Sequence, residues 1–187
     1  MTTELGVWLQ AQPSENRLHL LRHQPSYFAK GGEVGRLVAW LTDFGFLEQK
    51  LEAVGITALI EDYDLALPLI SAGEQQALQL VQFSTAIRPT LIQTESAKEQ
   101  QVLKLIQGVL KLSSHVLAED TSQLVGQLLG RLLSFSEPEI QAFLEQVKQA
   151  QDRLWFRPRF PCLDSPGSAL IRTFAWHSAI CAVALKG

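Results

Sequence analysis

Residues 96–119 read Ser96-Ala-Lys-Glu-Gln-Gln-Val-Leu-Lys-Leu-Ile-Gln-Gly-Val-Leu-Lys-Leu-Ser-Ser-His-Val-Leu-Ala-Glu119. Apolar side chains recur here at intervals of three and four residues, and the stripe comprises Val102, Leu105, Ile106, Val109, Leu112, Val116 and Leu117. That spacing places them on one face of an α-helix, with charged side chains outside the face. Ser96 and Glu99 have the spacing of a capping box. The sequence therefore predicts that a long amphipathic helix begins at Ser96.

The same periodicity extends over the rest of the first 150 residues, where Gly, Pro and N-cap residues separate the segments. The expected helices span residues 14–28, 33–41, 44–54, 57–67, 74–87, 96–118, 120–133 and 136–147. Pro25 is expected to interrupt or bend the first of them, and Pro68 and Gly73 to end the fourth. Gly126 and Gly130, one turn apart, predict a close crossing with another helix.

Eight helical segments with short links predict an all-α protein, an array of antiparallel helical pairs that forms either a bundle or a short solenoid. The residue composition changes near Asp152, where the Leu- and Gln-rich helical pattern gives way to a Pro-rich stretch and two short apolar runs. We therefore expect a helical domain over residues 1–152, a connector over 153–169 and a C-terminal extended or β-hairpin appendage over 170–187.

Composition excludes several classes of protein. The chain has 187 residues, 47% of them hydrophobic and 19% charged, which is enough for one domain with a core. Its net charge of −3 is spread along the chain, so nucleic acid is not an expected partner. Apolar stretches fall short of a membrane span, and the N-terminus does not resemble a secretory signal, so a cytoplasmic location is expected. Cys162 and Cys181 are then expected to be free thiols.

Two groups of polar residues are candidates for a reactive site. His19 and His23 are four residues apart and can share one helical face, but no third metal ligand accompanies them. Glu61, Asp62 and Asp64 form an acidic cluster whose members diverge on a helix, which predicts a solvated face rather than acid–base chemistry. No catalytic, cofactor-binding or metal-ligating residue is assigned, and no cofactor or enzymatic activity is expected.

Specific strings point further than periodicity does. Asp43-Phe-Gly-Phe-Leu-Glu-Gln-Lys-Leu-Glu-Ala53, Ala58-Leu-Ile-Glu-Asp-Tyr-Asp64, residues 105–118 and residues 123–133 resemble the helical region of bacterial, especially cyanobacterial, signalling NTPases of the STAND type. These proteins are related to apoptotic protease-activating factor. In that family the helical region lies between a nucleotide-binding module and a WD40 propeller. Trp155-Phe-Arg-Pro-Arg-Phe-Pro-Cys-Leu163 and Leu170-Ile-Arg-Thr-Phe-Ala-Trp-His177 resemble its connector and the opening of the first propeller blade.

The resemblance covers about residues 18–185 and implies a non-enzymatic regulatory scaffold that binds protein partners: an NTPase, a propeller or another copy of itself. Trp176 replaces the Gly usual before His177, and residues 170–185 are too few for a blade of ~40 to 45 residues. We therefore expect a truncated propeller start and no nucleotide-binding module in this chain. A TPR- or HEAT-like peptide-binding adaptor is the alternative, and a recurring helix length would favour it. An enzyme would require His19, His23 or the acidic cluster to converge in one pocket.

Overall fold

The computed structural model describes residues 3–82, 89–149, 158 and 160–167, with residues 74–82 and 89–96 described by their backbone only. The described part is all-α and contains no strand. Its helices are α1 (Glu4–Gln10), α2 (Ser14–Lys30), α3 (Val34–Leu41), α4 (Phe44–Ala53), α5 (Ile56–Gln82), α6 (Pro89–Leu112), α7 (Ser114–Glu119), the 3₁₀ turn η1 (Thr121–Gln123), α8 (Leu124–Leu132) and α9 (Pro138–Gln149). None of these described helices has an apolar stretch long enough to cross a membrane.

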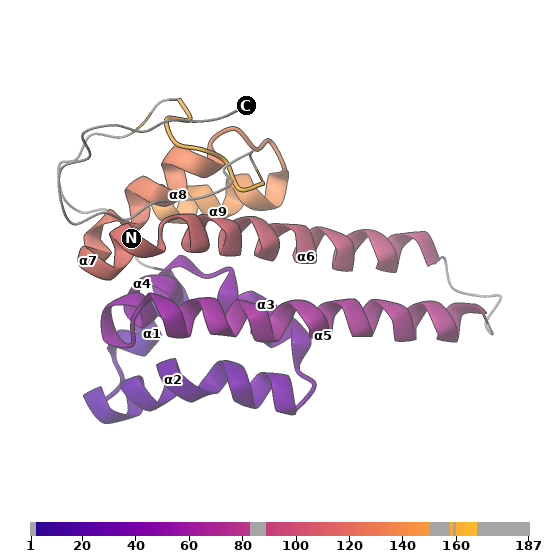
Figure 1. Ribbon diagram of the computed structural model, residues 1–187. Helices are drawn as coiled ribbons and strands as arrows, with labels where there is room; N and C mark the ends of the chain where they lie inside the picture. Colours follow the sequence, from indigo (N-terminus) through magenta and orange to yellow (C-terminus); the bar gives the residue numbers. More distant parts are fainter. Residues whose placement is uncertain (1–2, 83–88, 150–157, 159, 168–187) are drawn as a thin grey trace, which may run out of the picture.

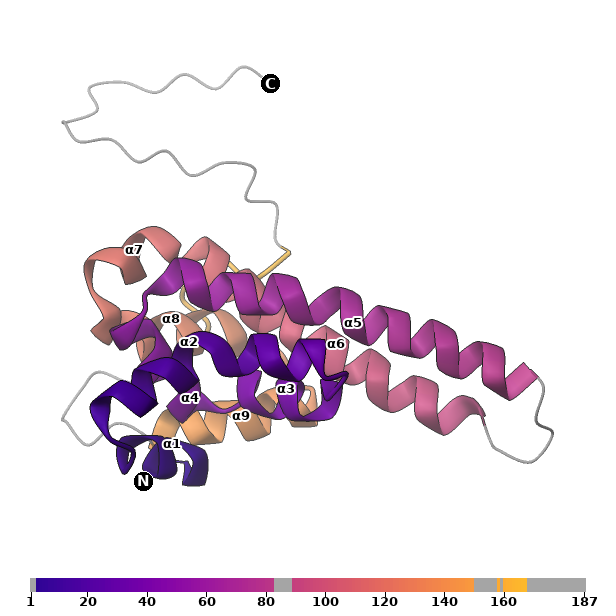
Figure 2. The ribbon, with the colours of Figure 1, turned by 90° about the horizontal axis from the view of Figure 1, so that it is seen from below.

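A long antiparallel hairpin of α5 and α6 runs through the centre of the molecule (Figure 1). Helices α1 to α4 lie on the α5 side of this hairpin, and α7 to α9 lie on the α6 side. The two long helices extend together beyond the shorter ones, and Figure 2 shows the same projection from a second direction. One apolar core connects the two halves, because α4 also contacts α9 and α3 also contacts α6.

Several helix boundaries follow from capping. Asp43 begins α4 as predicted, and its Oδ1 accepts a hydrogen bond from the Phe46 amide at 3.0 Å. Asp120 likewise accepts from the Ser122 amide, which opens η1 ahead of α8. The sequence did not predict α1. This helix crosses α4 where Gly6 meets Gly45, with Thr3 Oγ1 donating to Asp43 at 2.7 Å.

Three predictions about proline and capping were wrong. Helix α5 continues through Pro68 and Gly73 instead of ending there, since the Pro68 ring is exposed while Ala66 and Ile70 beside it are buried. The interruption of α2 expected at Pro25 does not occur, because the helix continues through this residue, whose buried ring is part of the apolar face. The long helix begins at Pro89 and not at Ser96, because the missing N–H of proline costs nothing at a first helical position.

Smaller differences occur at other boundaries. The segment expected over 96–118 is divided, with α6 ending at Leu112 and α7 beginning at Ser114. Helix α9 begins at Pro138, two residues after the Ser136 that was expected to cap it. The expected boundary near residue 152 and the appendage over 170–187 lie outside the described residues.

The prediction for Gly130 was correct about close approach but wrong about the partner. A Cβ added at Gly130 would stand 2.8 Å from the Leu163 side chain, and one added at Gly126 would meet only Gln123 Oε1, at 4.0 Å. The segment that passes over Gly130 is residues 160–167, which we call the strap. The small residue therefore admits an irregular segment, and no helix of the described part of the chain crosses at Gly130.

Candidate functional site: an acidic-rimmed groove between α3, α6 and α9

An apolar depression lies where α3, α6 and α9 meet. Its main part has a volume of about 340 Å³, and a second part of about 240 Å³ continues from it between α6 and α9. Val102 and Glu139 line both parts, so we treat them as one groove. The residues of the main part are Gly35, Val38, Ala39, Thr42, Glu99, Val102, Glu139, Ala142, Phe143 and Gln146.

The floor of the groove is the outer edge of the hydrophobic core. Val38, Val102 and Phe143 come from three different helices, and each is more than nine-tenths buried. Ala39 and Ala142 are exposed on the walls, where their small side chains leave the space open. The groove therefore exists because large apolar residues fill the junction from below while small residues face each other above.

Polar contacts fix the helices that form the walls. Gln146 Oε1 on α9 accepts a hydrogen bond from the Phe44 amide at 3.2 Å, which holds α9 against the start of α4. At the rim, Lys98 on α6 pairs with Glu139 on α9 at 3.4 Å. Both side chains of that pair are exposed, so it contributes little stability. Packing and the partly buried hydrogen bond between Gln146 and the Phe44 amide set the width of the groove.

The rim carries an excess of negative charge. Glu99, Glu137 and Glu139 line the groove with Lys98 as the cation among the lining residues, a balance of −2. The backbone amide of Glu139 and the nearby Lys98 lower the pKa of the Glu139 carboxyl, which keeps it ionised at neutral pH. Glu137 Oε2 is shielded from solvent and has no hydrogen-bond partner among the described residues. A buried carboxylate oxygen without a donor is costly, and a cation from a partner would satisfy it.

The lining of the groove is suited to binding rather than to catalysis. Apart from the hydroxyl of Thr42, which donates to the carbonyl of Val38 at 2.9 Å, its polar side chains are carboxylates, amides and one lysine on the rim. Apolar grooves of helical proteins accept amphipathic helices, which insert side chains at i, i+3, i+4 and i+7. The geometry matches that mode of recognition.

The histidine pair predicted from sequence lies on the solvent-exposed face of α2. His19, His23 and Tyr27 are exposed and their rings cluster, with the two imidazole centroids 4.8 Å apart. No group of three or more His, Cys, Asp or Glu side chains positioned to hold a metal occurs in the described residues. The cluster and the groove do not share residues.

The prediction of a solvated acidic face at Glu61, Asp62 and Asp64 was correct for two residues and wrong for the third. Glu61 and Asp64 are exposed, but Asp62 is buried and pairs with Lys50 of α4. Burial raises the pKa of Asp62 to about 6, and the Lys50 ammonium opposes that rise. Periodicity could have revealed this, because Asp62 lies between Leu59 and Ala66 on the core face of α5.

Comparison with known proteins gives no assignment: no family model, curated protein or solved structure matches the chain. The functional argument therefore depends on the groove itself. Sequence reasoning did not find it, because its walls come from segments about 60 and 40 residues apart in the chain.

Proposed function

We propose that this protein is a non-enzymatic helical scaffold that binds a protein partner in the groove between α3, α6 and α9. The partner is an amphipathic helix whose apolar face is flanked by Lys or Arg. The single observation that carries the proposal is the unpartnered Glu137 Oε2 beside an apolar floor. An apolar face would cover Val102 and Phe143, and a flanking cation would reach the acidic rim.

The resemblance to STAND-type NTPases gives this groove a context. In that family the helical region connects a WD40 sensor to an NTPase, so helices of such a module, or of a second copy of this chain, are the partners we propose. Association in the cytoplasm is part of the same proposal. The resemblance supports these identities by sequence strings alone, and the groove supports the mode of binding independently of them.

A TPR- or HEAT-like adaptor is the competing proposal, and helix lengths count against it. Such repeats stack helical pairs of recurring length. Among the described helices the length ranges from 6 residues in α7 to 27 in α5. An irregular array with a groove at a three-helix junction fits a dedicated scaffold better than a repeat adaptor.

The test uses two synthetic helical peptides that have the same Leu face at i, i+3, i+4 and i+7. One carries Lys at the flanking positions and the other carries Glu. We expect the Lys peptide to bind the full chain saturably in fluorescence anisotropy, and the Glu peptide to bind at least about tenfold more weakly, since each 1.4 kcal/mol is a factor of ten. Saturable binding of neither peptide, or equal binding of both, would overturn the proposal.

Matched variants locate the binding site. Ala142→Arg adds bulk and positive charge on the groove wall at an exposed position, and we expect it to abolish binding of the Lys peptide. Ala118→Arg makes the same change on an exposed position of α7 outside the groove, and binding should persist. Glu137→Gln removes the charge of the carboxylate whose Oε2 has no hydrogen-bond partner among the described residues. It should weaken binding of the Lys peptide and leave binding of the Glu peptide unchanged. Loss of binding in both arginine variants would place the peptide elsewhere.

A further inference from the structure

The strap, residues 160–167, lies across α6 and α8 on a surface that the groove does not include. The amides of Cys162 and Leu163 both donate to the carbonyl of Gly130 at 3.1 Å. That carbonyl lies in the last turn of α8, where helix carbonyls have no intrahelical donor. The strap therefore satisfies a helix end that would otherwise need water.

The Arg131 side chain of α8 also binds the strap. Arg131 donates from Nη1 to the carbonyl of Asp164 at 2.7 Å, and its Nε donates to Ser113 Oγ at 3.1 Å. Ser113 is fully buried, and its hydroxyl donates to Gln127 Oε1 at 2.9 Å. The guanidinium is thus held through Nε by residues of the helical body, while its Nη1 binds the strap backbone.

Two glycines act as recesses for strap side chains. The Leu163 side chain lies over Gly130, where an added Cβ would be 2.8 Å from Leu163 Cδ1. The Pro166 ring lies over Gly108 of α6, where an added Cβ would be 2.7 Å from Pro166 Cβ. The surface thus contacts the strap at two side chains three residues apart, Leu163 and Pro166, and at the backbone carbonyl of Asp164 between them.

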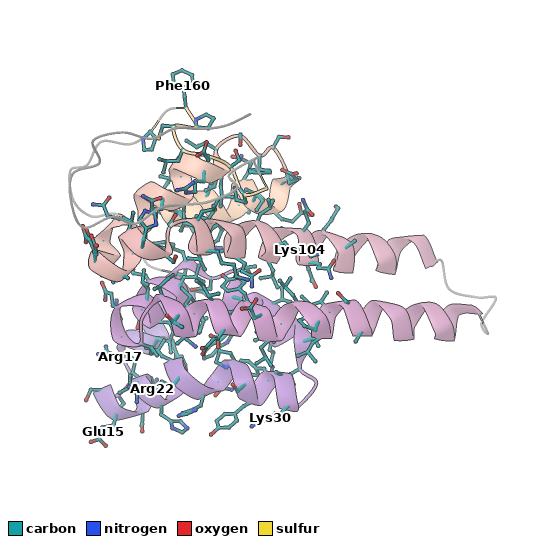
Figure 3. All side chains as sticks on the ribbon, viewed as in Figure 1. Glu15, Arg17, Arg22, Lys30, Lys104 and Phe160 are labelled. Atoms are coloured by element: carbon teal, nitrogen blue, oxygen red, sulfur yellow. The ribbon has the colours of Figure 1, made fainter. Side chains whose placement is uncertain are left out.

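The strap is nevertheless lightly held. Phe160 is 77% exposed and points away from the body of the molecule, and Leu163 retains 37% exposure in its recess (Figure 3). Core leucines such as Leu128 and Leu132 of α8 are fully buried by contrast. Segments with few buried apolar contacts are the first to open locally.

We propose that the surface over Gly108 and Gly130 is a recognition site for an irregular Leu-x-x-Pro segment, occupied in cis by the chain's own strap and open in trans to the strap of a second copy. The same hydrogen bonds and recesses would serve either occupant. Exchange of identical segments is a low-cost route to association, because the exchanged contacts are those already made within one chain. This site is separate from the proposed helix-binding groove.

The test measures binding of a fluorescein-labelled peptide with the sequence of residues 158–167 to the full chain. In one variant, Leu163→Asp and Pro166→Asp loosen the cis strap and leave the recesses unchanged. We expect the labelled peptide to bind this variant at least tenfold more tightly than it binds the wild type. Adding Gly108→Ala should abolish that binding because the rigid proline ring cannot yield, whereas adding Gly126→Ala should not. A scrambled peptide should not bind.

A second measurement does not require the strap to be mutated. Hydrogen exchange of the Cys162 and Leu163 amides should accelerate in Gly108→Ala and stay at the wild-type rate in Gly126→Ala, because only the first substitution displaces the strap. The proposal is overturned if the loosened variant, shown to be folded by circular dichroism, fails to bind the peptide. Binding that is insensitive to Gly108→Ala, or exchange rates equal in the two glycine variants, would overturn it as well.

Discussion

Replacing Lys50 with methionine should destabilise the protein in a strongly pH-dependent way. Lys50 and Asp62 pair inside the core between α4 and α5, with side-chain exposures of 1% and 8%. The Lys50 ammonium also lies 5.7 Å from the centre of the Phe46 ring. Methionine is an unbranched apolar side chain that fills most of the same space, but it leaves the Asp62 carboxyl buried without a cation.

The sign of the pH dependence follows from the pKa of Asp62. Burial raises this pKa from 3.8 to about 6 in the folded protein, and removing the opposing ammonium should raise it further. A folded-state pKa above the unfolded value means that protonation favours folding, so this contribution is full below about pH 4 and is lost as pH rises through the folded-state pKa. Lys50→Met should therefore cost little near pH 5 and about 3–5 kcal/mol near pH 8, where a lone carboxylate is buried.

Urea unfolding followed by circular dichroism at the two pH values gives the free energies. Lys111→Met is the matched control, because it breaks an exposed pair with Asp64 whose side chains are 48% and 56% exposed. Hydrogen bonding to Lys111 lowers the pKa of Asp64, so this carboxylate is ionised at both pH values. Because the pair is exposed, Lys111→Met should reduce the free energy of unfolding by less than about 1 kcal/mol at either pH. The double variant Lys50→Met/Asp62→Leu should recover most of the loss. Equal losses for Lys50→Met near pH 5 and pH 8 would refute the reasoning.

Three further substitutions probe the backbone and the core. Tyr63→Phe removes the hydroxyl that donates to the Leu41 carbonyl at 2.6 Å at the end of α3, and the orphaned carbonyl should cost about 1–3 kcal/mol in urea unfolding; an unchanged free energy would mean that water replaces the donor. Gly45→Ala places a Cβ 2.7 Å from the Gly6 backbone and should cost about 1–3 kcal/mol, with α1 losing amide protection in hydrogen exchange; retained protection would contradict this. Gly126→Ala meets little and should instead stabilise by about 0.5–1 kcal/mol, measured by the same unfolding assay.

The sequence predicted the helices wherever one apolar face dominates. The stripe through Val102, Ile106 and Val109 is buried as expected, and Asp43 caps the helix that it was assigned. Prolines were the main source of error. A proline inside a helix costs about 3 kcal/mol or more by local rules, yet Pro25 and Pro68 both lie in continuous helices. The Pro25 ring is buried in the apolar face of α2, whereas the Pro68 ring is exposed and burial of its neighbours Ala66 and Ile70 holds α5 in place.

The groove could not be predicted from the periodicity of the sequence, for a different reason. Helix periodicity says which face is buried, but it does not say which three helices meet. In the sequence neither Ala39 nor Ala142 indicates a binding site, since alanine is common on helix surfaces. They line the walls of the groove only because α3 and α9 face each other across α6. The position of the strap could not be predicted from the sequence either. Gly130 predicts a close approach of another segment, but nothing in the sequence indicates that Leu163 is the residue that approaches it.

The two proposed sites meet on one helix, and this has a consequence for how the scaffold would transmit binding. Helix α6 contributes Val102 to the groove and Gly108 to the strap recess, six residues and about 9 Å apart along its axis. A helix this well packed moves as a rigid body, so a partner that shifts α6 in the groove also shifts the recess under Pro166. Coupling between sites is reciprocal, so release of the strap would in turn change affinity in the groove. The position of α6 at the centre of the molecule therefore offers a physical route from a helix bound in the groove to the strap.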